Sequence, residues 1–360
     1  MAMAVRMAER GLGTTAPNPS VGAVVVCPKT LQILGRGWTQ PSGRPHAEPM
    51  ALKRAAGVVR GATLYVTLEP CSHHGASPPC VTAIISAGIQ RVVVGIMDPD
   101  PRVAGRGLAQ LRNAGIAVKL GVLAAECRWV TLGHILRVTE RRPFTQLKLA
   151  LDADGQAPRG QAGAPVWVTG ADARRRGHLL RAMTDAIVIG QRTMIDDNPS
   201  LTCRLPGLLH QSPSRFILSG HTPIDGKLTI LKDNLASTCW VTRQAADVPL
   251  QVQDSDCDVM RVTSVNGQVW LPAVMEDFVA RGVTRLLVEG GPTIWRAFDC
   301  RRLVDEVIMF RARGGVGQQQ PSEVLKLYTP RSSLELVHQI SLEYDDMFIF
   351  RRSNALPNSW

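Results

Sequence analysis

Three potential zinc ligands and one carboxylate stand close together in the first quarter of the chain. Glu48 follows His46 by two residues, and Cys71 and Cys80 come later in Glu-Pro-Cys and Pro-Pro-Cys segments. One histidine and two cysteines supply the three protein ligands of a catalytic zinc site, whose fourth position stays open for water. Such a site activates water to attack a ring carbon that bears an amine, while a nearby glutamate moves protons to the leaving ammonia. The pattern therefore predicts hydrolytic deamination with Glu48 as the proton carrier.

Two other interpretations of these residues stay open from the sequence. A structural zinc site would need a fourth ligand, for which His73 or His74 could serve, but it would leave Glu48 without a role. Alternatively, His46 is an ordinary surface histidine and the two cysteines are core thiols, which would require three coincidences.

Length and composition predict a two-domain enzyme. The chain has 360 residues, of which 45% are hydrophobic, enough to bury two cores. Eight scattered cysteines and no basic, apolar N-terminal run favour a reducing cytoplasm, and no stretch approaches the roughly 20 apolar residues that span a bilayer. The cysteines outside the zinc pattern are expected to be buried thiols: Cys27, Cys127, Cys203, Cys239, Cys257 and Cys300.

A net charge of +11 could point to nucleic acid, whose phosphates attract clustered basic residues. The arginines are instead dispersed, with only small groups such as 174–176 and 301–302. We therefore expect most of them on the solvated surface and a few as ligands of a phosphorylated small molecule.

The first 140 residues alternate between apolar runs and helical patterns, which predicts an α/β layered domain. Strands are expected at 21–26, 33–37, 63–68, 91–96 and 117–120, and helices at 1–10, after His46, at 79–87 and at 108–114. Both zinc-ligand clusters then fall at strand-to-helix junctions, where active sites of open α/β sheets commonly lie.

The second half shows a similar alternation. Strands are expected at 144–151, 186–190, 215–218, 238–242 and 285–288, and an arginine-rich helix at 171–183. The charged segment 137–143 ends in proline and predicts a linker. We expect domains at 1–140 and 144–354.

A Gly-Gly turn after the last of these strands could bind phosphate. In Glu289-Gly290-Gly291-Pro292-Thr293 the turn opens a helix, whose first backbone N–H groups can bind a phosphate. Taken alone, this segment is equally consistent with a phosphate-binding loop and with a simple turn. Likewise, Arg181 and Arg204 taken alone would be surface ion pairs.

Several longer motifs identify a family. The chain resembles, over nearly its whole length, the bifunctional deaminase/reductases of riboflavin biosynthesis. The resemblance rests on Pro17–Pro19, Val21–Val25, Thr67–Gly75, Pro78–Cys80, Asp98–Pro101, Val103–Gly107, Asp197–Arg204 and Val288–Thr293.

The resemblance implies a cytidine-deaminase-like three-layer α/β/α domain followed by an α/β domain similar to dihydrofolate reductase. It implies zinc-dependent deamination of 2,5-diamino-6-(5-phosphoribosylamino)pyrimidin-4(3H)-one, and then NADPH-dependent reduction of the ribosyl chain to ribityl. It also implies one zinc ion per chain, a phosphorylated pyrimidine as substrate, no nucleic-acid or membrane partner, and a cytoplasmic homo-oligomer.

The resemblance assigns roles residue by residue. His46, Cys71 and Cys80 would hold zinc, and Glu48 would be catalytic. The pyrimidine substrate would meet Asn18 and Asp98 in the first domain, and Arg181, Leu201, Arg204 and Glu289 in the second. NADPH would contact Leu151, Trp167, Thr193, Asp197, Gly290, Gly291, Pro292 and Thr293.

The chain departs from the family pattern at several positions, which include Gln156, where the family usually has a basic residue, and the segment 310–315, which lacks the usual Pro-Lys. Thr39, Ala76 and Asp100 replace a histidine, a basic residue and an asparagine at substrate-contact positions, and Asp152 replaces a serine near the cofactor. These changes leave two other functions open: a nucleic-acid-editing deaminase with an accessory domain, and a non-catalytic nucleotide sensor. In addition, Met1 lies so close to the first expected helix that the start is compatible with truncation.

Overall fold

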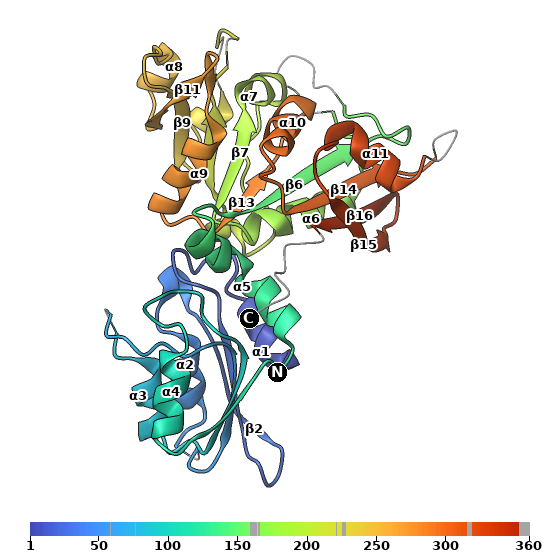
Figure 1. Ribbon diagram of the computed structural model, residues 1–360. Helices are drawn as coiled ribbons and strands as arrows, with labels where there is room; N and C mark the ends of the chain where they lie inside the picture. Colours follow the sequence, from blue (N-terminus) through green and yellow to red (C-terminus); the bar gives the residue numbers. More distant parts are fainter. Residues whose placement is uncertain are drawn as a thin grey trace. The chain divides into compact units, whose positions relative to one another are not determined.

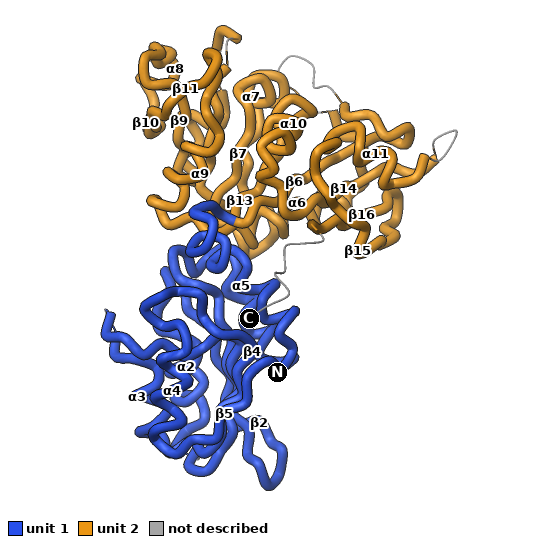
Figure 2. Tube along the Cα trace, in the orientation of Figure 1, with its two compact units in different colours: residues 1–143, 356–360 blue, residues 144–355 orange. Residues whose placement is uncertain are grey.

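The chain forms two compact units in a computed structural model (Figures 1 and 2). Unit 1 comprises Met1–Pro143, and unit 2 begins at Phe144. The structure describes residues 1–57, 59–75, 77–158, 164, 166–220, 222–224, 228–314 and 319–352.

The described residues of unit 1 form a five-stranded sheet in the order β2-β1-β3-β4-β5. β1 runs antiparallel to β2 and β3, whereas β3, β4 and β5 are parallel. The strands are β1 (Gly22–Val26), β2 (Ile33–Trp38), β3 (Thr63–Leu68), β4 (Arg91–Ile96) and β5 (Ala117–Leu120).

Helices cover both faces of this sheet, which makes the three-layer α/β/α arrangement that the sequence predicts (Figure 1). Alternate side chains of a strand point to opposite faces. Ala23 and Val25 of β1 share a core with α2, α3 and α4, whereas Val24 packs against α1. The helices are α1 (Ala2–Glu9), α2 (Ala47–Arg54), α3 (Cys80–Ser86), α4 (Arg106–Asn113) and α5 (Ala124–Thr139).

Close packing of α2 on β2 fixes the position of the first zinc-ligand segment. A Cβ atom at Gly37 would lie 2.2 Å from the backbone oxygen of Ala47, a distance that no side chain tolerates. Glycine therefore lets the first turn of α2 lie directly on the sheet, and this turn carries Glu48 two residues after His46.

The described residues of unit 2 form a nine-stranded sheet in the order β10-β9-β8-β7-β13-β6-β14-β16-β15. The strands from β10 to β14 are parallel, and β16 and β15 continue the sheet antiparallel. They are β6 (Phe144–Leu151), β7 (Ala186–Gly190), β8 (Ser214–Leu218), β9 (Thr238–Arg243), β10 (Asp258–Val262), β13 (Arg285–Val288), β14 (Glu306–Ala312), β15 (Leu334–Ser341) and β16 (Asp345–Arg352). A separate hairpin joins β11 (Ser264–Val265) to β12 (Gln268–Val269).

Both faces of the second sheet are buried, as parallel strands require. Val188 of β7 belongs to the core under α9, α10 and α11, whereas Ile187 and Ile189 belong to the core under α7 and α8. The helices are α6 (Ala171–Ala182), α7 (Gln191–Asp197), α8 (Leu250–Gln253), α9 (Leu271–Ala280), α10 (Pro292–Cys300) and α11 (Pro321–Tyr328). The predicted α/β class is thus confirmed in both units.

The predicted linker at 137–143 is wrong in its first part, because α5 continues to Thr139. Seven consecutive residues of this helix, 130–136, are buried. A helix buried all round lacks the polar and apolar stripes by which a sequence pattern reveals a helix.

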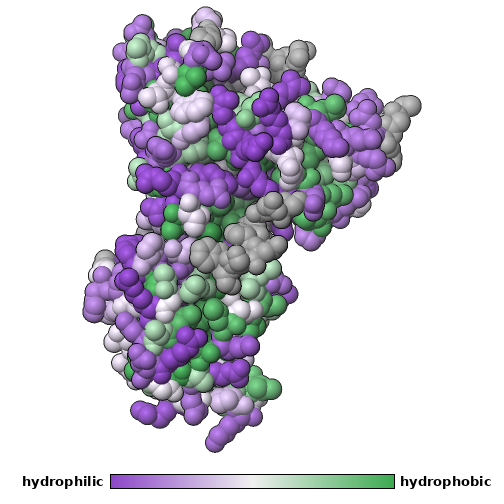
Figure 3. Space-filling view, viewed as in Figure 1, coloured by the Kyte–Doolittle hydropathy of each residue, from purple (hydrophilic) through white to green (hydrophobic). Residues whose placement is uncertain are grey.

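The visible face of each unit mixes hydrophilic and hydrophobic residues without a single large block of either kind (Figure 3). Among the described residues, no helix has the length and apolar character needed to cross a membrane.

Candidate active sites

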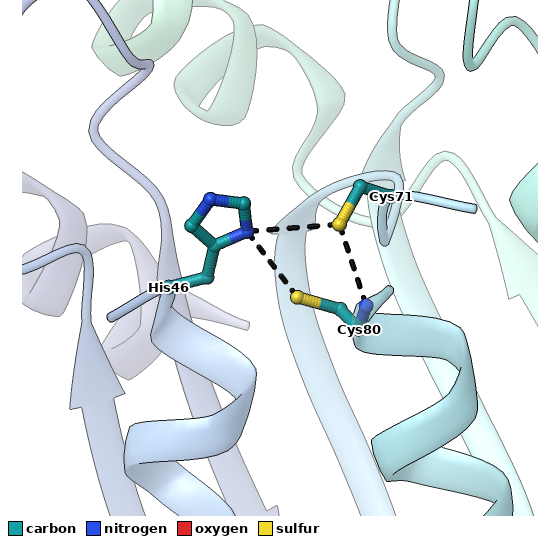
Figure 4. A group of neighbouring side chains, drawn as sticks. All are labelled: His46, Cys71 and Cys80. Carbon is teal, nitrogen blue, oxygen red and sulfur yellow. Dashed lines mark hydrogen bonds between the residues drawn. The ribbon is translucent and has the colours of Figure 1, made fainter. Parts of the chain in front are cut away.

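The three predicted zinc ligands meet at one point of unit 1 (Figure 4). His46 precedes α2, Cys71 follows β3, and Cys80 is the first residue of α3. His46 Nδ1 lies 3.3 Å from the Cys80 sulfur and 3.6 Å from the Cys71 sulfur. All three ligand atoms lie within 4.8 Å of one another, so a single ion can contact them together.

The charge of this cluster suits a cation. A hydrogen bond from Cys80 lowers the pKa of the Cys71 thiol to about 4, and the Cys80 backbone N–H also donates to the Cys71 sulfur at 3.3 Å. The hydrogen bond with Cys71 and burial together raise the pKa of the Cys80 thiol. A lowered thiol pKa favours the thiolate form that binds metal, and a histidine with two cysteines is a donor set that zinc favours.

Glu48 lies beside the cluster in the first turn of α2 and is only 3% exposed. Burial, followed by the charge of Cys71, raises the pKa of its carboxyl group to about 7. A carboxyl group that titrates near neutral pH can both accept and return a proton. Glu48, which the sequence predicts as the proton carrier, therefore lies buried in the helix turn that follows His46.

A cavity of about 250 Å³ opens in front of the cluster. Asn18 and Asp98, the two substrate residues expected in this unit, both line it. The side-chain amide of Asn18 donates to the backbone oxygen of Gly43 at 3.1 Å. Thr39 also lines the cavity, and its hydroxyl accepts from the Val21 N–H at 3.0 Å.

Glu69 also lines this cavity and holds two of its segments together, a role that the sequence did not reveal. Its carboxylate accepts four backbone N–H groups, from Asp98, Gly105, Gly107 and Leu108, at 2.9–3.3 Å. It thereby fastens the Asp98 loop and the start of α4 to the strand that leads into Cys71. Glu69 stands in the Glu-Pro-Cys segment, which was the one available signal.

His134 of α5 is the second cavity residue that sequence reasoning missed. Its Nε2 lies 3.0 Å from an oxygen of Asp98, and both side chains are buried. The same Asp98 oxygen accepts the N–H of Asp100 at 2.9 Å. No motif surrounds His134 in the sequence, so only the fold places it beside Asp98.

A much larger cavity, of about 1210 Å³, lies in unit 2. It extends along the ends of β7 and β13 and the starts of α7 and α10. Among the predicted cofactor and substrate residues, those that line it are Trp167, Arg181, Thr193, Asp197, Leu201, Arg204, Glu289, Gly290, Gly291, Pro292 and Thr293. Leu151 is not brought to the cavity wall, because its side chain is fully buried in the core between β6 and its neighbours.

Glu289 and Arg181 form an ion pair in this cavity. Two guanidinium nitrogens donate to the two carboxylate oxygens at 2.9 and 2.8 Å. Burial alone would raise the pKa of Glu289, but the charges of Arg181 and Lys148 outweigh it and lower the pKa to about 2. Burial lowers the pKa of Lys148, which also lines the cavity.

The Gly-Gly turn forms the helix start that the sequence predicts. Gly291 is the N-cap of α10, and Gly290 has a φ of +120°. A Cβ atom at Gly290 would lie 3.0 Å from the hydroxyl of Thr193, so glycine also keeps this wall open. The free N–H groups at such a helix start can bind a phosphate.

Two family models match the chain. The "RibD C-terminal domain" covers residues 143–343, and the "Cytidine and deoxycytidylate deaminase zinc-binding region" covers residues 1–96. The riboflavin biosynthesis protein RibD of Aquifex aeolicus is 36% identical, with 88% of this chain and 87% of the relative aligned. This chain belongs to the RibD family of bifunctional deaminase/reductases of riboflavin biosynthesis.

Two further matches support the same family assignment. RibD of Escherichia coli is 36% identical, with 87% of this chain and 86% of the relative aligned. The solved Thermotoga maritima structure of a diaminohydroxyphosphoribosylaminopyrimidine deaminase/5-amino-6-(5-phosphoribosylamino)uracil reductase is 32% identical, with a TM-score of 0.81 over 98% of this chain and 97% of that chain. The chain is therefore a RibD-family enzyme with a zinc-binding deaminase domain and an NADPH-dependent reductase domain. The full-length match supports this function over an editing deaminase or a nucleotide sensor.

The departures from the RibD pattern fall into different surroundings. Asp100 lines the first cavity, and Arg102 donates to both of its carboxylate oxygens. Asp152 does not line the second cavity; its carboxylate accepts the backbone N–H groups of Asp154 and Gln156 in a turn. Ala76 lies outside the described residues.

Trp167 is 60% exposed at the rim of the second cavity. The guanidinium of Arg174 lies 5.4 Å from the centre of its ring. An exposed aromatic ring at a cavity rim offers a flat surface for a ligand.

Proposed function

We propose that residues 1–140 carry the deaminase activity and residues 144–354 the reductase activity. In the first, His46, Cys71 and Cys80 hold one zinc ion, and Glu48 is the catalytic residue. The observation that supports this most is the meeting of three ligand atoms within 4.8 Å beside a buried carboxyl group whose pKa is about 7.

The substrate of the deaminase half is 2,5-diamino-6-(5-phosphoribosylamino)pyrimidin-4(3H)-one. Zinc, when bound, supplies a Lewis acid that makes water a stronger nucleophile. Glu48 accepts a proton from the attacking water and delivers protons to the ring and to the departing amine. A carbon–oxygen bond forms, the carbon–nitrogen bond breaks, and ammonia leaves. Asn18 and Asp98 orient the ring by hydrogen bonds.

The reductase half takes the deaminated product. NADPH, when bound, supplies a hydride for the ribosyl chain. Gly290, Gly291, Pro292 and Thr293 receive a cofactor phosphate, and Trp167, Thr193 and Asp197 line the rest of the cofactor site. Arg181, Leu201, Arg204 and Glu289 bind the substrate, beside the ammonium group of Lys148. The buried ion pair between Arg181 and Glu289 keeps two of these groups in fixed orientation.

A split assay on zinc-loaded protein tests both halves. Ammonia release is followed without cofactor, and NADPH oxidation is followed after NADPH is added. Glu48→Gln keeps the size and shape of the side chain but removes the proton carrier, so deamination should fall by about 10²- to 10⁴-fold. Zinc content and NADPH oxidation on deaminated substrate should stay at the wild-type level. Undiminished ammonia release by this variant would contradict the assignment of Glu48.

We further propose a cytoplasmic homo-oligomer. The reducing cytoplasm suits the proposed site because Cys71 and Cys80 must remain thiols to bind metal. An oligomer is supported by β15, whose exposed side chains include Leu336 and Val337 at the edge of the nine-stranded sheet. Sedimentation of the purified protein would test the oligomer.

A further inference from the structure

The deaminase cavity is rich in carboxylates, although the proposed substrate carries a negatively charged phosphate. Glu48, Glu69, Asp98 and Asp100 all line it. A phosphate that enters these surroundings needs a cation with free N–H donors. Among the described residues that line the cavity, only Arg44 and Arg102 are arginines, and none is a lysine.

Arg102 is already neutralised. Its Nε donates to both oxygens of Asp100 at 3.0 and 3.1 Å, and its Nη2 donates at 2.6 Å. This pairing also lowers the pKa of Asp100 to about 2. The pair is close to electrically neutral, and Nε and Nη2 of the guanidinium already donate to Asp100.

Arg44 is in the opposite situation. Its Nη1 donates to the hydroxyl of Ser77 at 2.9 Å, and in the described part of the chain no carboxylate forms an ion pair with it. The side chain is exposed at the mouth of the cavity. A Cβ atom at Gly75 would lie 3.7 Å from its Nη2, so the arginine lies along the loop between the two cysteines. The uncharged hydroxyl orients the guanidinium without cancelling its charge.

Arg44 lines the same cavity as the predicted zinc ligands His46 and Cys71. Arg44 precedes His46 by two residues, and His46 belongs to the cluster at the inner end of the cavity. If the pyrimidine ring binds at this cluster and at Glu48, its ribosyl phosphate extends away from the cluster, and the exposed Arg44 is a cation of the same cavity that can meet it.

We propose that Arg44 is the phosphate-binding residue of the deaminase site and gives it its preference for a phosphorylated substrate. The inference rests on the proposed deaminase function. A planar guanidinium oriented by one neutral hydrogen bond keeps its other N–H groups for two phosphate oxygens.

The test is ammonia release without NADPH, measured on the phosphorylated pyrimidine and on its dephosphorylated analogue. For Arg44→Gln we expect KM for the phosphorylated substrate to rise about tenfold with kcat within about twofold, because phosphate binding is the same in ground and transition states. The kinetic constants for the dephosphorylated analogue should not change. Arg44→Lys keeps the positive charge but lacks the planar guanidinium group. Its KM for the phosphorylated substrate should lie between the values of wild type and Arg44→Gln.

Two controls make the result specific. Lys53→Gln removes one positive charge from an exposed position at the end of α2 and should leave KM unchanged. Ribose 5-phosphate should inhibit ammonia release competitively in the wild type, and its inhibition constant should rise about tenfold in Arg44→Gln.

Equal KM values for wild type and Arg44→Gln on the phosphorylated substrate would overturn the proposal. So would a rise in KM that occurs in Arg102→Gln but not in Arg44→Gln, since it would assign the phosphate to Arg102. If the wild type released ammonia from neither substrate, the proposed deaminase function itself would fail, which is distinguishable from both outcomes.

Discussion

The two cavities use different means to place their functional groups. In unit 1, a cavity of about 250 Å³ stands before three ligand atoms that come from short segments at the starts of α2 and α3 and the end of β3. In unit 2, a cavity of about 1210 Å³ is lined by residues from Lys148 to Tyr328. The small site concentrates its chemistry in a few side chains, whereas the large one spreads binding along a cofactor.

Because of this difference, a single residue should matter more in unit 1 than in unit 2. In the mechanism proposed above, proton transfer at the small site depends on one carboxyl group, Glu48. In the large cavity the protein supplies binding and orientation, because the cofactor carries the reactive hydride. A change at one residue should therefore be severe in unit 1 and graded in unit 2, except at the buried Arg181–Glu289 pair.

Removal of metal should separate the two sites most completely. Dialysis against a chelator should abolish ammonia release, because the water would no longer be activated. NADPH oxidation on deaminated substrate should stay within about twofold, since the described lining of the second cavity shares no residue with the cluster. Added zinc should restore ammonia release. A parallel loss of NADPH oxidation would show that the two sites are not independent.

Acid should weaken unit 2 through Glu289. Its pKa is about 2 in the folded chain against an ordinary value of 4.5, so its contribution to stability is complete above about pH 4.5. This contribution, on the order of 3 kcal/mol, is lost as the pH falls towards 2. The measurement is the free energy of unfolding against pH for wild type and Glu289→Gln.

The difference in free energy of unfolding between wild type and Glu289→Gln should shrink with falling pH across this range. Arg181→Met/Glu289→Gln serves as a control, because it leaves no unpaired buried arginine. A difference that does not change with pH would contradict the role of the ion pair.

Loss of the Glu69 carboxylate should have a smaller effect, confined to unit 1. In Glu69→Gln one oxygen becomes an NH₂ group that faces backbone donors, so two of the four backbone N–H groups lose their acceptor. We expect kcat/KM for ammonia release to fall about tenfold while zinc content stays unchanged. Glu126→Gln, at an exposed position of α5, is the matched control and should have no effect.

Asp152→Asn should have the smallest effect. Asp152 accepts two backbone N–H groups in a turn and does not line the cavity, and asparagine keeps one accepting oxygen. KM for NADPH should stay within about twofold of the wild-type value. A larger fall in KM would show that the charge of Asp152 does repel the cofactor.

Much of the framework could be predicted from local patterns. The strands β3, β4, β5, β6, β7 and β13 begin and end at the predicted residues. All but the largely exposed β5 are short apolar runs between turns, a pattern characteristic of buried strands. The strands β14, β15 and β16 and the helix α5 were not predicted. For α5 the reason is its burial on all sides, which removes the helical stripe.

The zinc site and the family could be predicted from the sequence alone, because ligand types and their spacing are local properties of the chain. Only the tertiary structure showed that Glu69 holds the Asp98 loop, that His134 supports Asp98, and that Arg44 keeps its charge. Arg181 and Glu289 are likewise 108 residues apart, and His134 and Asp98 are 36 apart. Such pairs form only when strands and helices distant in sequence pack together, and no local pattern records which charges then meet and which remain free.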